Sequence, residues 1–379
     1  MYVEWIEKFK NVAVQDRIRG SLIGGAAGDA LGYAVEFMSL TEIDRVYQGC
    51  IQSYHLDSFS GEALISDDTQ MTLFTANGIL RGETLKKMEG ARNHSSVYIY
   101  EAYLDWLRTQ GMESVDSARK EGFGSWLLEA GKLHTRRAPG GTCLGALRSG
   151  KQGSIAQPLN DSCGCGGVMR VAPVGLYRGD LSGEEVMLEA AEAAAITHGH
   201  PMGYIPAGVL AFMIHRIVFG GVIDLYKIVS EAQELLPTVF GENAMSERMV
   251  NYLGLAAMIS RNESEADWPN IARLGEGWVG DEALAIAVYC CLRYPHDFSK
   301  CIAAAVNHDG DSDSTGAIAG NILGALHGYE SIDMKWKEKL ELHDVILEMA
   351  DDLYSGVPES DDDERMKTWL KKYKEGKRV

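Results

Sequence analysis

Apolar residues recur every three or four positions through most of the chain, which is the spacing of an amphipathic α-helix. The clearest case is residues 97–108, whose apolar face carries Val97, Tyr100, Tyr103, Leu104 and Leu107. The alternation of apolar and polar residues that marks a half-buried β-strand is absent, and no strand–helix alternation occurs. The pattern therefore predicts an all-α protein.

The same periodicity predicts further helices along the chain. They cover residues 16–32, 66–82, 184–195, 204–219, 223–236, 244–258, 282–292 and 317–326. Between them, residues 39–65 are expected to form a loop with short helical turns, and residues 138–167 to be rich in loops. No internal repeat is present. We expect one domain over residues 1–379, with an N-terminal extension at 1–15 and a charged, solvated tail at 357–379.

Composition narrows the class of protein. The chain has 379 residues, 46% hydrophobic and 24% charged, as in ordinary globular proteins. Its net charge of −18 argues against a general nucleic-acid-binding surface. Seven cysteines, an odd number, together with an N-terminus unlike a signal peptide, indicate reduced thiols. No run is expected to span a membrane, so we expect a cytoplasmic protein.

Two acidic stretches far apart in the chain have similar chemistry. Residues 66–69 read Ser-Asp-Asp-Thr, and residues 308–316 read His-Asp-Gly-Asp-Ser-Asp-Ser-Thr-Gly. Each puts carboxylates and hydroxyls at the start of an expected helix. Hard oxygen ligands of this kind suit Mg²⁺, Mn²⁺ or Ca²⁺ rather than zinc. The alternative is that Ser66, Asp67 and Asp313 are helix caps, since Ser and Asp favour that position.

Glycine clusters at residues 139–143 and 160–167 form the second candidate feature. Successive backbone N–H groups in such clusters can bind phosphate oxygens. Neither cluster is a Walker A loop, because no Gly-Lys-Ser/Thr follows. The alternative is an ordinary turn, which is the commoner role of such glycines.

Six short motifs, in the same order, resemble those of the ADP-ribosylglycohydrolase family. They are Gly28-Asp29-Ala30-Leu31-Gly32 with Glu36, then residues 66–69, 160–173 (NDSCGCGGVMRVAP), 197–199 (THG), 275–283 (GEGWVGDEA) and 310–314 (GDSDS). The match runs from about residue 16 to about residue 329 and so covers most of the chain.

The resemblance implies an orthogonal all-α bundle with two Mg²⁺ or Mn²⁺ ions at the floor of a cleft. The implied metal ligands are Ser66, Asp67, Asp68, Asp311, Asp313 and Ser314. The implied substrate-binding residues are Ser162, Gly164, Cys165, Gly166, Gly167, His198 and Trp278. Two positions depart from the family: the last metal hydroxyl, commonly Thr, is Ser314, and the usual Asn is replaced by Cys165.

The implied function is hydrolysis of the glycosidic bond between ADP-ribose and an acceptor. Glu36 is the first candidate for the catalytic carboxylate that stabilises positive charge or acts as base, and Asp68 is the second. The expected partners are an ADP-ribosylated protein or other acceptor, and a cognate ADP-ribosyltransferase or toxin target. Two alternatives stay open: a metal-dependent phosphohydrolase of nucleotide diphosphates, and a catalytically silent ADP-ribose-binding protein.

Overall fold

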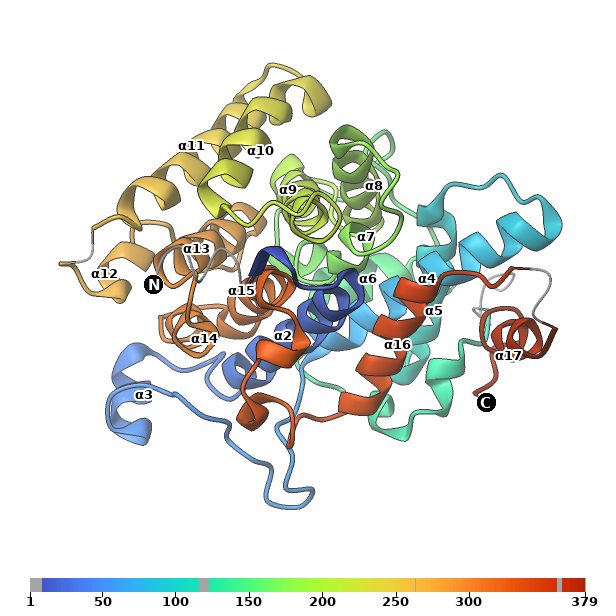
Figure 1. The fold of residues 1–379 in the computed structure, drawn as a ribbon, viewed down its shortest axis with the longest axis horizontal. Helices are drawn as coiled ribbons and strands as arrows, with labels where there is room; N and C mark the ends of the chain where they lie inside the picture. The colour runs from blue at the N-terminus through green and yellow to red at the C-terminus, as the bar shows by residue number, and fades with distance from the viewer. Residues whose placement is uncertain (1–8, 116–122, 263, 360–362, 379) are drawn as a thin grey trace.

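The computed structural model describes residues 9–115, 123–262, 264–359 and 363–378. These ranges fold into helices (Figure 1) and contain no β-strand, only two isolated β-bridges. The prediction of an all-α fold is therefore confirmed. The α-helices are α2 (Val14–Tyr33), α3 (Leu40–Tyr47), α4 (Asp67–Glu89), α5 (Ser95–Thr109), α6 (Gly141–Arg148), α7 (Ala172–Gly175), α8 (Gly183–Ala195), α9 (Pro201–Val218), α10 (Leu225–Phe240), α11 (Ala244–Ile259), α12 (Asp267–Ile271), α13 (Gly280–Arg293), α14 (Phe298–Val306), α15 (Ser312–His327), α16 (His343–Ser355) and α17 (Asp363–Tyr373).

Helices α2 and α15 lie side by side at the centre of the molecule (Figure 1). Every fourth residue along the contact is small: the α2 positions are Gly20, Gly24, Gly28 and Gly32, and the α15 positions are Ser312, Gly316, Gly320 and Gly324. A methyl group added at Gly24 would lie 2.4 Å from the carbonyl oxygen of Gly320, and one at Gly28 would lie 1.9 Å from that of Gly316. Because the partners run in opposite order, the helices are antiparallel. Only glycine permits this separation.

The remaining helices cover this central pair. Helices α13 and α14 pack on α15, and α16 packs on α2. Helices α8 and α9 pair with each other, as do α4 and α5. The end of α2 is thereby held next to the start of α15, and the start of α4 comes close to both.

Helix α4 is longer than the periodicity predicted. We expected it to end near Gly82, but it continues to Glu89 and ends at Gly90, which has a left-handed φ of +66°. Gly82 does not break the helix because it packs against α5: a methyl group there would lie 2.6 Å from the Tyr98 ring. The expected loop region 138–167 likewise contains a short helix, α6.

Helix α9 corrects the expectation that no segment could span a membrane. Its 18 residues from Pro201 to Val218 are long and apolar enough by length and composition. However, 83% of this segment is buried inside the protein, which is the environment of a core helix.

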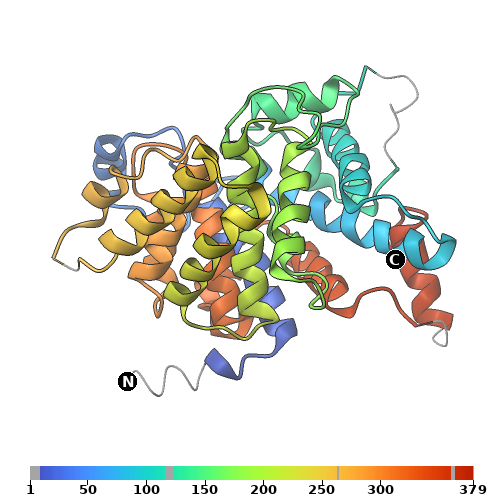
Figure 2. The ribbon, with the colours of Figure 1, turned by 90° about the horizontal axis from the view of Figure 1, so that it is seen from above.

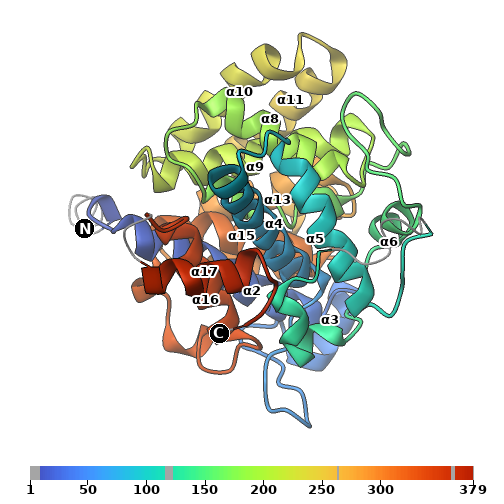
Figure 3. The same cartoon turned by 90° about the vertical axis from the view of Figure 1, so that its right-hand side faces the viewer.

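The C-terminal tail is also different from the expectation of a solvated terminus. Helix α17 lies beside α4 and α16 (Figures 2 and 3). The Trp369 indole donates to Thr84 Oγ1 at 2.8 Å, and the Tyr373 hydroxyl donates to Asp352 at 2.5 Å. Both aromatic side chains are buried, so apolar burial outweighs the charge of the surrounding residues. The expected extension at 1–15 overlaps the first turn of α2, and its residues 1–8 lie outside the described ranges.

The glycine contact predicts a sharp asymmetry between alanine substitutions. Gly24→Ala should lower the free energy of unfolding by at least about 1–3 kcal/mol, since its methyl group meets backbone that cannot rotate away. Gly145→Ala is the matched control, because that helical glycine has nothing within 4 Å of an added methyl group. Urea unfolding monitored by circular dichroism measures both. Equal stability of the two variants would contradict the close contact.

Candidate active site

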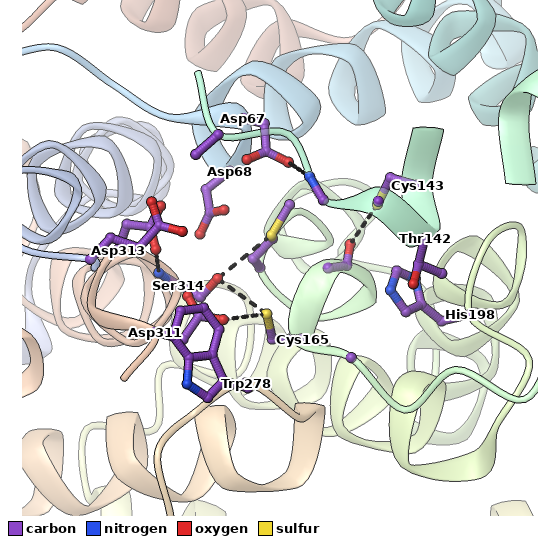
Figure 4. A pocket seen from close by; sticks show the side chains of 17 residues that line it. Asp67, Asp68, Thr142, Cys143, Cys165, His198, Trp278, Asp311, Asp313 and Ser314 are labelled. Carbon is purple, nitrogen blue, oxygen red and sulfur yellow. Dashed lines mark hydrogen bonds between the residues drawn. The ribbon is translucent and has the colours of Figure 1, made fainter. Parts of the chain in front are cut away.

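The residues singled out in the sequence gather around one pocket, of about 180 Å³ (Figure 4). We call it the reaction pocket. Eleven of the predicted site residues line it: Glu36, Asp67, Asp68, Gly164, Cys165, Gly166, His198, Trp278, Asp311, Asp313 and Ser314. Asp68, Asp311, Asp313 and Ser314 lie on one side, and Thr142, Cys143 and His198 on the other. Both acidic stretches and the glycine loop therefore contribute to a single site.

The first acidic stretch is held in place by Asp29, a fully buried residue at the end of α2. Its carboxylate accepts hydrogen bonds from the backbone N–H of Ser66 (2.9 Å) and of Thr69 (3.1 Å), and from the Thr69 hydroxyl. Burial raises the pKa of Asp29 to about 6, although these donors act in the opposite direction. No role was predicted for Asp29, because the sequence does not show that its donors lie about forty residues downstream.

Ser66 caps a helix, as the alternative to metal binding predicted, and this does not exclude a role as metal ligand. Ser66 is the N-cap of α4, and its hydroxyl accepts from the N–H of Asp68 at 3.2 Å. Asp67 instead accepts from the N–H of Gly140 at 3.3 Å, which ties the first glycine cluster to the acidic stretch. The N-cap of α15 is Asp311, whereas Asp313 accepts from the N–H of its neighbour Ser314 at 2.9 Å. It therefore does not act as a conventional N-cap.

The second acidic stretch is positioned by Gly310 and the start of α15. Gly310 has φ +139°, and a methyl group there would lie 2.0 Å from the carbonyl oxygen of Glu276, so the turn requires glycine. The N–H of Asp311 donates to the same carbonyl at 2.9 Å. Cys165 adds a contact from the glycine loop, since its thiol lies 2.6 Å from Asp311 Oδ2.

Carboxylates are crowded at the acidic end of the reaction pocket. Burial, followed by the charges of neighbouring carboxylates, raises the pKa of Glu36 to about 9. Burial, opposed by the Gly140 N–H and reinforced by Asp29 and Asp311, raises the pKa of Asp67 to about 8. The pKa values of Asp68 and Asp313 are raised well above the usual range for the same reasons. The site therefore strongly favours added positive charge.

These residues fit a divalent cation in their chemistry. Among the residues that the structure describes, the buried oxygens Glu36 Oε2 and Asp68 Oδ2 have no hydrogen-bond partner. Carboxylate and hydroxyl oxygens are the donors that Mg²⁺ and Mn²⁺ prefer. Within the described ranges, no three His, Cys, Asp or Glu side chains are already arranged to hold a metal ion. Binding would require the carboxylates to turn toward a common centre.

The opposite end of the reaction pocket is formed by the glycine loop and His198. A backbone hydrogen bond joins the loop to the segment around Trp278: the N–H of Cys165 donates to the carbonyl of Trp278 at 3.1 Å. A methyl group at Gly166 would lie 3.0 Å from the His198 ring and 3.1 Å from the sulfur of Cys143. A side chain at Gly166 would therefore fill the space between the loop and His198.

Three predicted residues lie outside the lining. Ser66 is buried as the cap described above. The Ser162 hydroxyl bonds that of Thr142 at 3.0 Å, just behind the loop. Gly167 packs against α9, where a methyl group would lie 2.5 Å from the carbonyl oxygen of Gly203. This close packing explains why position 167 is a glycine.

A buried cation, Arg170, lies close to His198 and orients the Thr197 hydroxyl that bonds it. Arg170 is fully buried, and its hydrogen-bond partners are the Thr197 hydroxyl at 2.7 Å and the sulfur atoms of Cys143 and Met71. Because arginine can only donate, the hydrogen of the Thr197 hydroxyl is free to point at His198 Nδ1, 2.8 Å away. His198 Nε2 then carries the ring hydrogen. Of the ring atoms, Nε2 would lie nearest to a methyl group added at Gly164.

His198 is also kept neutral. Burial, and then the nearby charge of Arg170, lowers its pKa to about 3. The site thus presents a neutral N–H donor backed by a buried positive charge. Both features suit an anionic group with oxygen acceptors. Neither Arg170 nor Thr197 received a role from the sequence, since only the fold brings them behind His198.

Comparison with known proteins identifies the class. A model of the ADP-ribosylglycohydrolase family matches residues 10–363, so the chain belongs to this family. The predicted family and enzyme class, an ADP-ribosylglycohydrolase, are confirmed.

Individual relatives are distant and match nearly end to end. The ADP-ribosyl-(dinitrogen reductase) glycohydrolase of Rhodospirillum rubrum is 24% identical, over 87% of this chain and 92% of that protein. The ADP-ribosylhydrolase ARH3 of Danio rerio is 25% identical, over 90% and 91%. A solved structure titled as an ADP-ribosylglycohydrolase-related protein complex superposes with a TM-score of 0.60 at 23% identity, covering 90% of this chain and 98% of that one. This likeness shows the shared all-α fold.

The hydrogen-bond chain predicts the tautomer of His198. Long-range ¹H–¹⁵N spectra should show a neutral ring with hydrogen on Nε2 from pH 8 to about pH 4. Thr197→Val should abolish this preference, and Thr197→Ser should keep it. An unfolded histidine binds a proton near pH 6.5 and the folded one only near pH 3, so stability should decrease as the pH falls below 6.5. Hydrogen on Nδ1, or titration near pH 6.5, would contradict the chain.

Proposed function

We propose that this protein hydrolyses the glycosidic bond between ADP-ribose and an acceptor, using two Mg²⁺ or Mn²⁺ ions at the acidic end of the reaction pocket. One observation carries the proposal. Two acidic stretches, distant in sequence, lie across one small pocket from the glycine loop and from His198, whose N–H donor is close to the buried cation Arg170. A ligand with a polyhydroxyl sugar at one end and an anionic diphosphate next to it matches that division of charge. The names of the relatives support an ADP-ribosylated acceptor as the substrate.

The reaction is a hydrolysis at the anomeric carbon of the distal ribose. Water adds to this carbon while the bond to the acceptor breaks with its electron pair. The acceptor takes up a proton, and ADP-ribose is released. The transition state resembles an oxocarbenium ion, as in glycoside hydrolysis generally.

The metal ions would be held by the six predicted ligands, Ser66, Asp67, Asp68, Asp311, Asp313 and Ser314. When bound, they would supply Lewis-acid polarisation and orient the ribose hydroxyls. The protein's own groups complete the site. His198 donates its Nε2 hydrogen to a diphosphate oxygen, and the loop at Gly164 and Gly166 leaves room for that group because it carries no side chains.

Glu36 is the proposed catalytic carboxylate. It lines the reaction pocket, is 7% exposed, and has a carboxylate oxygen without a partner. It can accept a proton from the attacking water or stabilise the positive charge that develops on the sugar. Asp68 is the second candidate for this role, since its Oδ2 is also unpartnered.

Product analysis tests the function directly. The protein, Mg²⁺ and a panel of acceptors carrying ADP-ribose on arginine, serine, an acetyl ester or a nucleobase are incubated, and products are identified by mass spectrometry. Release of ADP-ribose is the expected result. AMP with a phosphoribosyl group left on the acceptor would indicate a phosphohydrolase, and unchanged substrate would indicate a silent binding protein.

Metal binding should be measurable without substrate. Mg²⁺ or Mn²⁺ should raise the melting temperature, by a stabilisation of about 2.7 kcal/mol at one hundred times the dissociation constant. Asp313→Ala should remove this shift and the metal-dependent activity, because a buried carboxylate is lost from the site. Asp344→Asn, an exposed acid on α16, is the matched control. Full activity in excess EDTA would contradict the metal proposal.

The role of Glu36 is tested by removing charge at constant shape. Glu36→Gln should lower the single-turnover rate of ADP-ribose release by about 10²–10⁴-fold. Affinity for ADP-ribose, measured by calorimetry, should change little. The exposed Glu338→Gln serves as control. A rate within a few-fold of wild type would assign the role to Asp68 instead.

A further inference from the structure

A second cavity, of about 390 Å³, adjoins the reaction pocket. We call it the side pocket. Trp278 lines both cavities, so they meet at this residue. Phe37 stacks against this ring at a centroid distance of 6.3 Å and an interplanar angle of 19°. A chain leaving the reaction pocket past Trp278 therefore enters the side pocket.

The side pocket carries negative charge. In the described part of the chain, its lining includes Glu276, Glu282 and Asp309 and no lysine or arginine. Glu282 accepts from the N–H of Glu276 at 3.0 Å, and Asp309 accepts from the N–H of Leu40 at 2.7 Å. Backbone donors thus hold two of the carboxylates in place, while Glu276 is exposed. Such a surface attracts cations and repels phosphate groups.

Two tryptophans add a feature that acidic residues alone do not provide. Trp268 is 53% exposed and Trp278 is 41% exposed, and both line the side pocket. Indole is the aromatic group that binds cations best through its face. An arginine or lysine side chain can satisfy the carboxylates and the aromatic faces together.

His308 supplies a buried ring nitrogen to the same cavity. It lines the side pocket, is 2% exposed, and its Nδ1 has no hydrogen-bond partner of normal geometry among the described residues. Its Nε2 lies 2.9 Å from Thr315 Oγ1. That hydroxyl has one hydrogen, and it lies 2.7 Å from the carbonyl of Ala305 and 2.9 Å from that of Asp311. These carbonyls compete for the single hydroxyl hydrogen, and the backbone of Asp309 and Ala305 also interacts with the ring, so His308 is a fixed polar group in the cavity wall.

We propose that the side pocket binds a cationic side chain, arginine or lysine, that flanks the ADP-ribosylated residue in the acceptor polypeptide. The inference rests on the proposed function for the position of the modified residue. It adds a preference for acceptors by local charge, whichever residue carries the ADP-ribose. Because the two pockets share Trp278, the cationic residue lies within a few positions of the modified one.

The test uses peptides that differ only in the flanking residue. Each peptide carries ADP-ribose on the same residue, with Arg, Gln or Glu beside it, in one series modified on serine and one on arginine. The cationic flank should raise kcat/KM by about 3–30-fold over Gln, mainly through KM, and Glu should lower it. The preference should decrease with added salt.

Variants locate the effect. Glu276→Gln and Trp268→Leu should reduce the preference for the cationic flank, and both sites are exposed, so the fold should tolerate the changes. Glu242→Gln, an exposed acid on the loop before α11, should leave the preference and the basal rate unchanged. Equal kcat/KM for the three flanks in the wild type would overturn the proposal.

A binding measurement separates this inference from the proposed function. Unmodified Arg-flanked and Gln-flanked peptides are titrated into the protein and followed by tryptophan fluorescence. Trp268-dependent binding of the Arg peptide without any hydrolysis of the modified peptides would support the surface and reject the proposed function. Hydrolysis with no difference in rate or binding between the peptides would do the reverse.

Discussion

The site depends on how closely α2 and α15 approach each other. Glycines at every fourth position bring backbone against backbone, so neither helix can slide or rotate without a clash. The end of α2 supplies Asp29 and leads to Glu36, and the start of α15 supplies Asp311 and Asp313. The contact therefore fixes the acidic groups relative to one another. Asp29 then extends this order to α4 through its hydrogen bonds to the first acidic stretch.

The reaction pocket has two ends of opposite character. Crowded, buried carboxylates at one end favour added cations, and their pKa values are raised first by burial and then by the charges of their neighbours. At the other end, Arg170 places a positive charge behind a neutral His198 and a loop without side chains. The hydrogen-bond partners of Arg170 among the described residues are neutral, so this buried charge costs stability, and an anion bound nearby would offset that cost.

The sequence predicted the elements that repeat a local pattern. The helical period gave most helices, and ordered motifs located both acidic stretches, the glycine loop, His198 and Trp278. The sequence could not show the roles of residues whose hydrogen-bond partners lie far away in the chain. Asp29 and Arg170 are ordinary charged residues until the fold places their partners next to them. The apolar length of helix α9 was underestimated, since it suffices to span a membrane by length and composition. The tail helix α17 was expected to be solvated because its charge does not reveal the burial of Trp369 and Tyr373.

The central claim is that the two acidic stretches form one metal-binding site. Anomalous X-ray diffraction from crystals soaked in Mn²⁺ tests it most directly, because the anomalous signal locates manganese independently of any assumed ligand. The account predicts anomalous peaks between residues 66–68 and residues 311–314, with oxygen ligands from both. Manganese bound elsewhere, or to only one stretch, would contradict it.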